Sequence, residues 1–131
     1  MKFNVVTIFP DLINDFINHG LVSRALVKNI LEVRTWNPRD FSDNHSGRID
    51  DKPFGGGQGM LLKPEPLIKT IDEIKTHNDT HVLFVAPHGK VFNQNKAHEL
   101  KNKKNITIIC GRYEGIDRRV EETSVDEVIS I

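Results

Sequence analysis

Two glycine-containing turns are the strongest chemical signal in the sequence, because each follows a run of apolar residues. Pro87-His88-Gly89 comes after the run at 82–86, and Gly111–Gly115 comes after the run at 106–110. In open α/β sheets, ligands bind beyond the carboxyl ends of the strands, and glycine lets the backbone approach a ligand closely. Either turn alone is more typical of an ordinary connection between a strand and a helix. Together they indicate a site whose backbone groups could hold an adenine or a ribose.

Acidic and glycine-rich segments provide further candidates. The carboxylate of Glu114, in the second turn, could bind a ribose hydroxyl or a cationic group, although an isolated loop Glu is more often a solvated charge. The pair Asp50-Asp51 could supply a base or a hydrogen bond to a nucleobase edge. The alternative is that the two carboxylates lie in a solvent-exposed turn and have no functional role. The run at 55–59, Gly-Gly-Gly-Gln-Gly, lacks the Lys-Ser/Thr and the flanking strand and helix of a phosphate loop. It is interpreted as a flexible loop that closes on a substrate, or as a linker.

Composition excludes several classes of protein. The 18 Lys and Arg residues balance 18 Asp and Glu residues, so no global basic field exists and any RNA contact must be local. Lysines 90–104 are interpreted as a solvated face, and Arg112, Arg118 and Arg119 beside the second turn are better phosphate-binding candidates.

The single Cys110, expected to lie in the core, indicates a reducing, cytoplasmic setting. The six histidines show no metal-binding spacing, and no segment resembles a signal peptide or membrane span.

The elements that must position these residues are predicted from periodicity. Apolar strands without alternation, separated by helices, predict an α/β fold with a parallel sheet covered on both faces. Residues 37–60 show no periodicity, and such a long loop is expected to be functional or disordered. The predicted strands are 3–9, 31–36, 82–86, 106–110 and 125–131, and the predicted helices are two between 11 and 30, then 64–75, 93–101 and 117–123.

Six segments in a fixed order resemble the bacterial tRNA (guanine-N1)-methyltransferase family, TrmD type, over essentially the whole chain. Each segment alone is a weak signal, but a chance match of all six in order is very unusual. The segments are residues 1–10, 37–41, 48–60, 63–66, 87–94 and 109–118.

The resemblance implies a SPOUT-class fold, a parallel α/β sheet flanked by helices and carrying a C-terminal trefoil knot. It also implies S-adenosylmethionine as methyl donor, Mg²⁺, a homodimer with shared active sites, and methylation of N1 of the guanosine 3′ of the tRNA anticodon. Residues 1–131 would then form the N-terminal part of the S-adenosylmethionine-binding SPOUT domain. The strand that threads the knot and the C-terminal tRNA-binding domain would lie beyond the chain.

Position by position, the resemblance implies three groups of site residues. Asp50 and Glu114 would have orienting roles, because the family's catalytic aspartate and its partner arginine lie downstream. His88 stands where glutamine is more usual, which puts a side-chain contact at that position in doubt. The cofactor-binding residues would be Ala86, Pro87, His88, Gly111, Tyr113, Glu114, Ser130 and Ile131, and the substrate-binding residues Arg48, Asp50, Gly55, Gly56, Gly57 and Gly59.

The end of the chain adds an expectation about activity. Val128 to Ile131 has the composition of a core strand, which favours truncation of a longer protein and predicts that this chain alone is inactive. One alternative is therefore an inactive module that binds cofactor or dimerises. Another is a flavodoxin-like nucleotide-binding domain, which fits the strand–helix order but does not explain residues 48–60.

Overall fold

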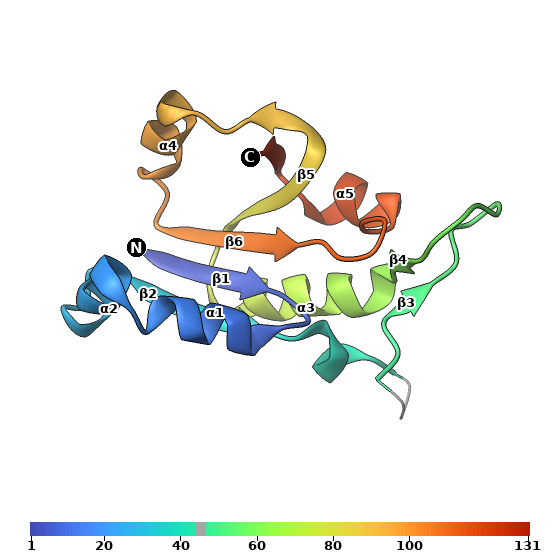
Figure 1. Cartoon of the computed structure of the whole chain (residues 1–131), viewed down its shortest axis with the longest axis horizontal. Coiled ribbons are helices and arrows are strands. Elements are labelled where there is room, and N and C mark those ends of the chain that lie inside the picture. Colours follow the sequence, from blue (N-terminus) through green and yellow to red (C-terminus); the bar gives the residue numbers. More distant parts are fainter. Residues whose placement is uncertain (44–46) are drawn as a thin grey trace.

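The computed structural model describes residues 1–43 and 47–131 of the chain. The two helices predicted between 11 and 30 are confirmed, with the break at His19-Gly20. The first, α1 (Pro10–Ile17), begins at Pro10, where proline's fixed φ suits a first helical turn. The elements are β1 (Lys2–Val6), α1 (Pro10–Ile17), α2 (Gly20–Val27), β2 (Glu32–Trp36), the 3₁₀ helix η1 (Pro38–Phe41), β3 (Asp50–Asp51), β4 (Leu61–Leu62), α3 (Pro64–His77), β5 (His81–Val91), α4 (Gln94–Leu100), β6 (Asn105–Cys110), α5 (Arg118–Ser124) and β7 (Glu127–Ser130) (Figure 1).

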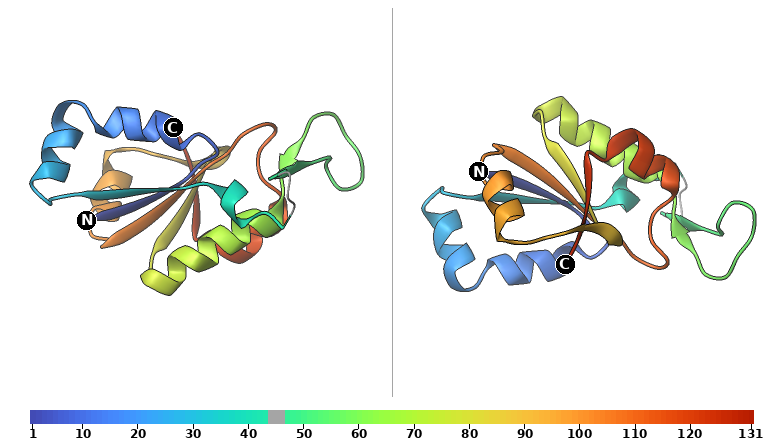
Figure 2. Two further views of the ribbon diagram at one scale, coloured as in Figure 1. Left: turned by 90° about the horizontal axis from the view of Figure 1, so that it is seen from below. Right: turned by 90° about the horizontal axis from the view of Figure 1, so that it is seen from above.

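Five strands form one sheet in the order β2-β1-β6-β5-β7, and every neighbouring pair is parallel. The predicted parallel α/β sheet is therefore confirmed. Figure 2 shows α3 and α5 on one face of the sheet and α1 and α2 on the other. No helix in the described part of the chain is long and apolar enough to cross a membrane.

The two faces of the sheet are covered unequally. The larger core lies under α3 and α5, where Leu67, Ile71 and Val120 are almost completely buried. A smaller cluster of Leu83, Leu100, Ile106 and Ile129 occupies the opposite face. Helices α1 and α2 contribute no buried residue to either cluster. The α1–α2 side is therefore the thinly packed side of the molecule.

Strand β5 is longer than predicted. The sequence predicted a strand at 82–86 that ends at Pro87, but β5 continues to Val91. It pairs with β7 twice, through Val85 and again through Lys90, both opposite Ile129, so residues between them form a bulge. A Cβ on Gly89 would lie 2.5 Å from the Ile129 carbonyl carbon. The bulge therefore requires glycine where the two backbones meet.

The segment 37–60 contains more regular structure than predicted, although residues 44–46 lie outside the described residues. It includes η1 and the first strand of a small antiparallel hairpin, β3–β4. Ile49 and Leu62 anchor the hairpin, since each is only 1% exposed and the Lys63 N–H donates to the Ile49 carbonyl at 2.7 Å. Strands of two residues are too short to produce a recognisable period, which is why the sequence did not reveal them.

Candidate functional site

The two glycine-containing segments lie side by side at one edge of the sheet. Strands β5 and β6 are parallel neighbours, and Val85 of the first is in register with Cys110 of the second. A cavity of about 470 Å³ opens beyond these two residues. All six of the residues predicted from these segments to bind cofactor line it, namely Ala86, Pro87, His88, Gly111, Tyr113 and Glu114.

The second segment forms a tight turn around this cavity. The Gly115 N–H donates to the Arg112 carbonyl at 3.1 Å, and the turn places Tyr113 at a φ of 61°. Positive φ is uncommon for residues other than glycine, and such strained conformations cluster at ligand-binding sites. A Cβ on Gly111 would lie 3.2 Å from the ring of Phe84, so glycine lets the turn pack closely against that ring. The turn thus presents its backbone and the Tyr113 ring, 46% exposed, to the cavity.

Sequence reasoning missed one side chain in this cavity. Glu121, on α5, lines the cavity, and its Oε2 lies 2.9 Å from Nε2 of His88. Its position in the sequence gives no signal, since a glutamate on a short helix is more often a solvated charge, and its approach to His88 depends on the tertiary fold. Arg112, considered only for phosphate contacts, also lines the cavity, and its guanidinium lies 5.7 Å from the Phe9 ring centroid.

The β3–β4 hairpin is joined directly to the second turn. The Glu114 N–H donates to the Met60 carbonyl at 3.0 Å, and the Leu62 N–H donates to the Gly115 carbonyl at 3.0 Å. A Cβ on Gly59 would lie only 2.4 Å from Cγ of Glu114. The structure therefore places one predicted substrate-loop residue, Gly59, against one predicted cofactor-site residue, Glu114.

The other predicted residues lie farther from the cavity. Gly55 and Gly56 sit at the hairpin tip, where an added Cβ would meet nothing within 4 Å, and Gly57 approaches only Pro53. Asp50 pairs with Leu62 in the hairpin and does not line the cavity. The last two predicted residues lie beside the end of β5, since Ser130 pairs with Val91 and neither Ser130 nor Ile131 lines the cavity.

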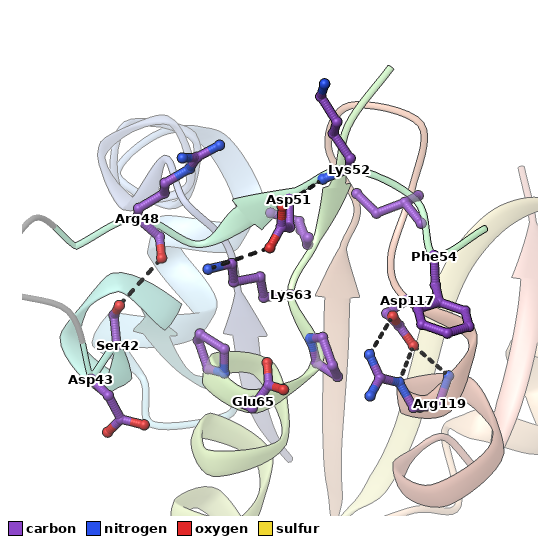
Figure 3. A pocket seen from close by; sticks show the side chains of 14 residues that line it. Ser42, Asp43, Arg48, Asp51, Lys52, Phe54, Lys63, Glu65, Asp117 and Arg119 are labelled. Atoms are coloured by element: carbon purple, nitrogen blue, oxygen red, sulfur yellow. Dashed lines mark hydrogen bonds and ion pairs between the residues drawn. The ribbon is translucent and has the colours of Figure 1, made fainter. Parts of the chain in front are cut away.

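A second cavity, of about 380 Å³, lies between the hairpin and the N-terminal ends of α3 and α5. Figure 3 shows the side chains around it, including Arg48, Lys52 and Phe54 from the hairpin and the segment before it. On the α5 side, Asp117 caps the helix by accepting a hydrogen bond from the Arg119 N–H. The Arg119 side chain also donates to Asp117 and lowers the pKa of that carboxyl. Both groups are therefore charged, and the charge of each is balanced by the other.

The chain also matches known proteins. The family model described as "tRNA (Guanine-1)-methyltransferase TrmD" matches residues 1–131. The chain belongs to this family. Curated relatives named "tRNA (guanine-N(1)-)-methyltransferase" include one from Sulfurimonas denitrificans, 46% identical over all of this chain and 57% of the relative, and one from Persephonella marina, 50% identical over all of this chain and 52% of the relative.

A solved structure supports the same TrmD assignment at the level of the fold. The crystal structure of tRNA (m1G37) methyltransferase from Aquifex aeolicus matches with a TM-score of 0.91 and 41% sequence identity. The match covers 100% of this chain and 59% of that one. The chain spans about half the length of the curated TrmD relatives it matches.

Proposed function

We propose that this chain supplies the cofactor-binding and substrate-loop parts of a tRNA (guanine-N1)-methyltransferase, which transfers a methyl group from S-adenosylmethionine to N1 of the guanosine 3′ of the anticodon. The observation that carries this proposal is the cavity shared by the β5 bulge and the turn after β6. Two backbone segments from neighbouring parallel strands meet there, at the carboxyl edge where α/β sheets bind nucleotides.

The residues around the cavity fit S-adenosylmethionine. The backbone at Ala86-Pro87 and at the turn from Gly111 would hold an adenosyl group, because Gly111 lines the cavity without a side chain. Glu114 would supply a carboxylate for a cationic part of the ligand. When bound, S-adenosylmethionine supplies a methyl group already activated by its sulfonium, so the chain's own contribution is binding and orientation.

Methylation at guanine N1 also requires removal of a proton, because that nitrogen is protonated at neutral pH. Transfer forms the bond between N1 and the methyl carbon and breaks the carbon–sulfur bond, whose electron pair stays on sulfur. A general base must accept the N1 proton, and the family resemblance gives this role to an aspartate downstream of residue 131. We assign Asp50 and Glu114 to orienting roles here, because the hairpin that carries Asp50 is hydrogen-bonded to the turn that carries Glu114.

The described residues do not fit the Mg²⁺ that the family resemblance implies. Within residues 1–43 and 47–131, no group of three or more His, Cys, Asp or Glu side chains could hold a metal ion.

A homodimer forms part of this proposal and is supported by the thinly packed side of the molecule. Helices α1 and α2 expose large apolar side chains, with Leu12 and Phe16 each 67% exposed and Leu21 79% exposed. Exposed apolar surface of this kind is typical of protein–protein contacts. We propose that a second copy covers this face, and that Phe16→Glu converts a dimer to a monomer in light-scattering measurements. A parent chain that is monomeric at high concentration would contradict the dimer.

Two measurements on the 131-residue chain test the proposed function. Calorimetric titration with S-adenosylmethionine should show binding at one site per chain. A methyl-transfer assay with a tRNA transcript should then show no turnover by this chain alone, and measurable turnover would contradict the reading as an inactive module. Absence of cofactor binding would contradict the function proposed for the cavity.

A further inference from the structure

The tip of the β3–β4 hairpin exposes an aromatic ring that the fold does not use. Phe54 is 99% exposed, more than any other large apolar side chain in the described part of the chain. Neighbouring Gly55 and Gly56 have positive φ values and no atoms near their Cβ positions, so no other side chain shields the ring. Exposure of a whole phenylalanine ring is unfavourable in water, because it leaves a large apolar area hydrated. The ring is therefore fully accessible to a binding partner.

The charges beside Phe54 indicate what kind of partner this is. Two of the cations around the adjoining cavity are already engaged, since Lys63 lies 3.8 Å from Asp51 and Arg119 pairs with Asp117. The other two, Arg48 and Lys52, form no ion pair with any residue in the described ranges.

In Figure 3 the side chains of Arg48 and Lys52 extend away from the start of α3, whereas Phe54 lies on the same side of the cavity as the Asp117–Arg119 pair. The hairpin thus carries an exposed ring and two cations without carboxylate partners. Single-stranded nucleic acids are bound by this combination, in which bases stack on aromatic rings and phosphates contact Arg and Lys.

We propose that Phe54 stacks on an unpaired base of the RNA substrate, and that Arg48 and Lys52 contact the phosphates that flank it. This inference rests on the proposed function, because it assigns an RNA-binding role to the hairpin that adjoins the cofactor cavity. The base on Phe54 is distinct from the guanine that is methylated, because the ring lies at the hairpin tip and the cofactor cavity lies at its base, beside Gly59 and Glu114. Phe54 is thus a positioning residue that acts on a neighbouring nucleotide.

The experiment measures binding of an anticodon stem–loop RNA to the 131-residue chain over a series of salt concentrations. Phe54→Ala should weaken binding about 5- to 150-fold, the range for loss of one stacked base, and should leave the slope of log K against log salt unchanged. Arg48→Gln and Lys52→Gln should each reduce that slope by about 0.7, because each removes one phosphate contact. Phe92→Ala, which removes an exposed ring elsewhere on the surface, should bind RNA like the parent chain.

A second readout reports on the ring directly. In Phe54→Trp, RNA should quench the tryptophan emission beyond any change in the parent chain, whose only tryptophan, Trp36, is buried. The inference is overturned if Phe54→Ala binds RNA like the parent or if the parent does not bind RNA at low salt. It is also overturned if the emission of the Phe54→Trp variant shifts with protein concentration alone, since a second copy would then cover the ring. Calorimetry with S-adenosylmethionine decides the proposed function separately, because Phe54 does not line the cofactor cavity.

Discussion

Replacement of Gly59 by alanine tests the contact between the substrate hairpin and the cofactor turn. Gly59 has a φ of +86°, and an added Cβ would lie 2.4 Å from Cγ, 3.0 Å from Oε1 and 3.1 Å from Cδ of Glu114. The positive φ alone costs about 1–2 kcal/mol for a residue with a Cβ. The overlap with Cγ cannot be relieved by rotating only the end of the Glu114 side chain, because Cγ lies near the backbone. The added Cβ must therefore also displace the Glu114 carboxylate from its position in the cavity.

A matched control separates these two effects. Gly56 has nearly the same φ, +88°, but a Cβ there would meet nothing within 4 Å. Gly56→Ala should therefore lose up to about 1–2 kcal/mol of unfolding free energy in urea titrations, and Gly59→Ala should lose at least as much because of the added overlap. Only Gly59→Ala should weaken S-adenosylmethionine binding, by about tenfold or more, because a hydrogen bond to a charged group contributes about 1.5–3 kcal/mol. Equal cofactor affinities for the two variants would refute the assigned role of Glu114.

Three further predictions concern the scaffold. Gly89→Ala should lower the unfolding free energy in urea by at least about 1–3 kcal/mol, because its Cβ would lie 2.5–2.7 Å from backbone atoms of Ile129; an unchanged midpoint would contradict the β5–β7 approach. Lys96 donates a hydrogen bond to Glu127 and lowers the pKa of that carboxyl, so the pair should stabilise the fold above the ordinary glutamate pKa and cease to do so as pH falls through the lowered value. In Glu127→Gln, the unfolding free energy should therefore fall less steeply with decreasing pH than in the parent chain. Equal pH dependence of the two unfolding free energies would count against the pairing. Burial raises the pKa of the Cys110 thiol, so Cys110 should react with an alkylating reagent at about pH 8 more slowly than free cysteine, whereas an equal rate would show that the thiol is accessible.

The sequence predicted the parallel sheet and the two glycine-containing segments around the cofactor cavity, because long apolar strands and the glycines that follow them are local signals. The segment after β6 is a turn as predicted, whereas residues 87–89 form a bulge within β5. The sequence could not predict that β5 continues past Pro87, since that extension depends on pairing with Ile129, far along the chain. The same limit applies to the pairing of His88 with Glu121 and to the contact of Gly59 with Glu114. Each arises from tertiary packing between segments whose own sequences show no preference for one another.

The central claim is that the β5 bulge and the turn after β6 form one cofactor site. The most direct test is to titrate S-adenosylmethionine into the ¹⁵N-labelled chain and to follow its backbone amide resonances. The account predicts that resonances of Ala86, His88 and residues 111–115 shift together and saturate at one ligand per chain. Shifts confined to one of the two segments, or no shifts at all, would contradict it.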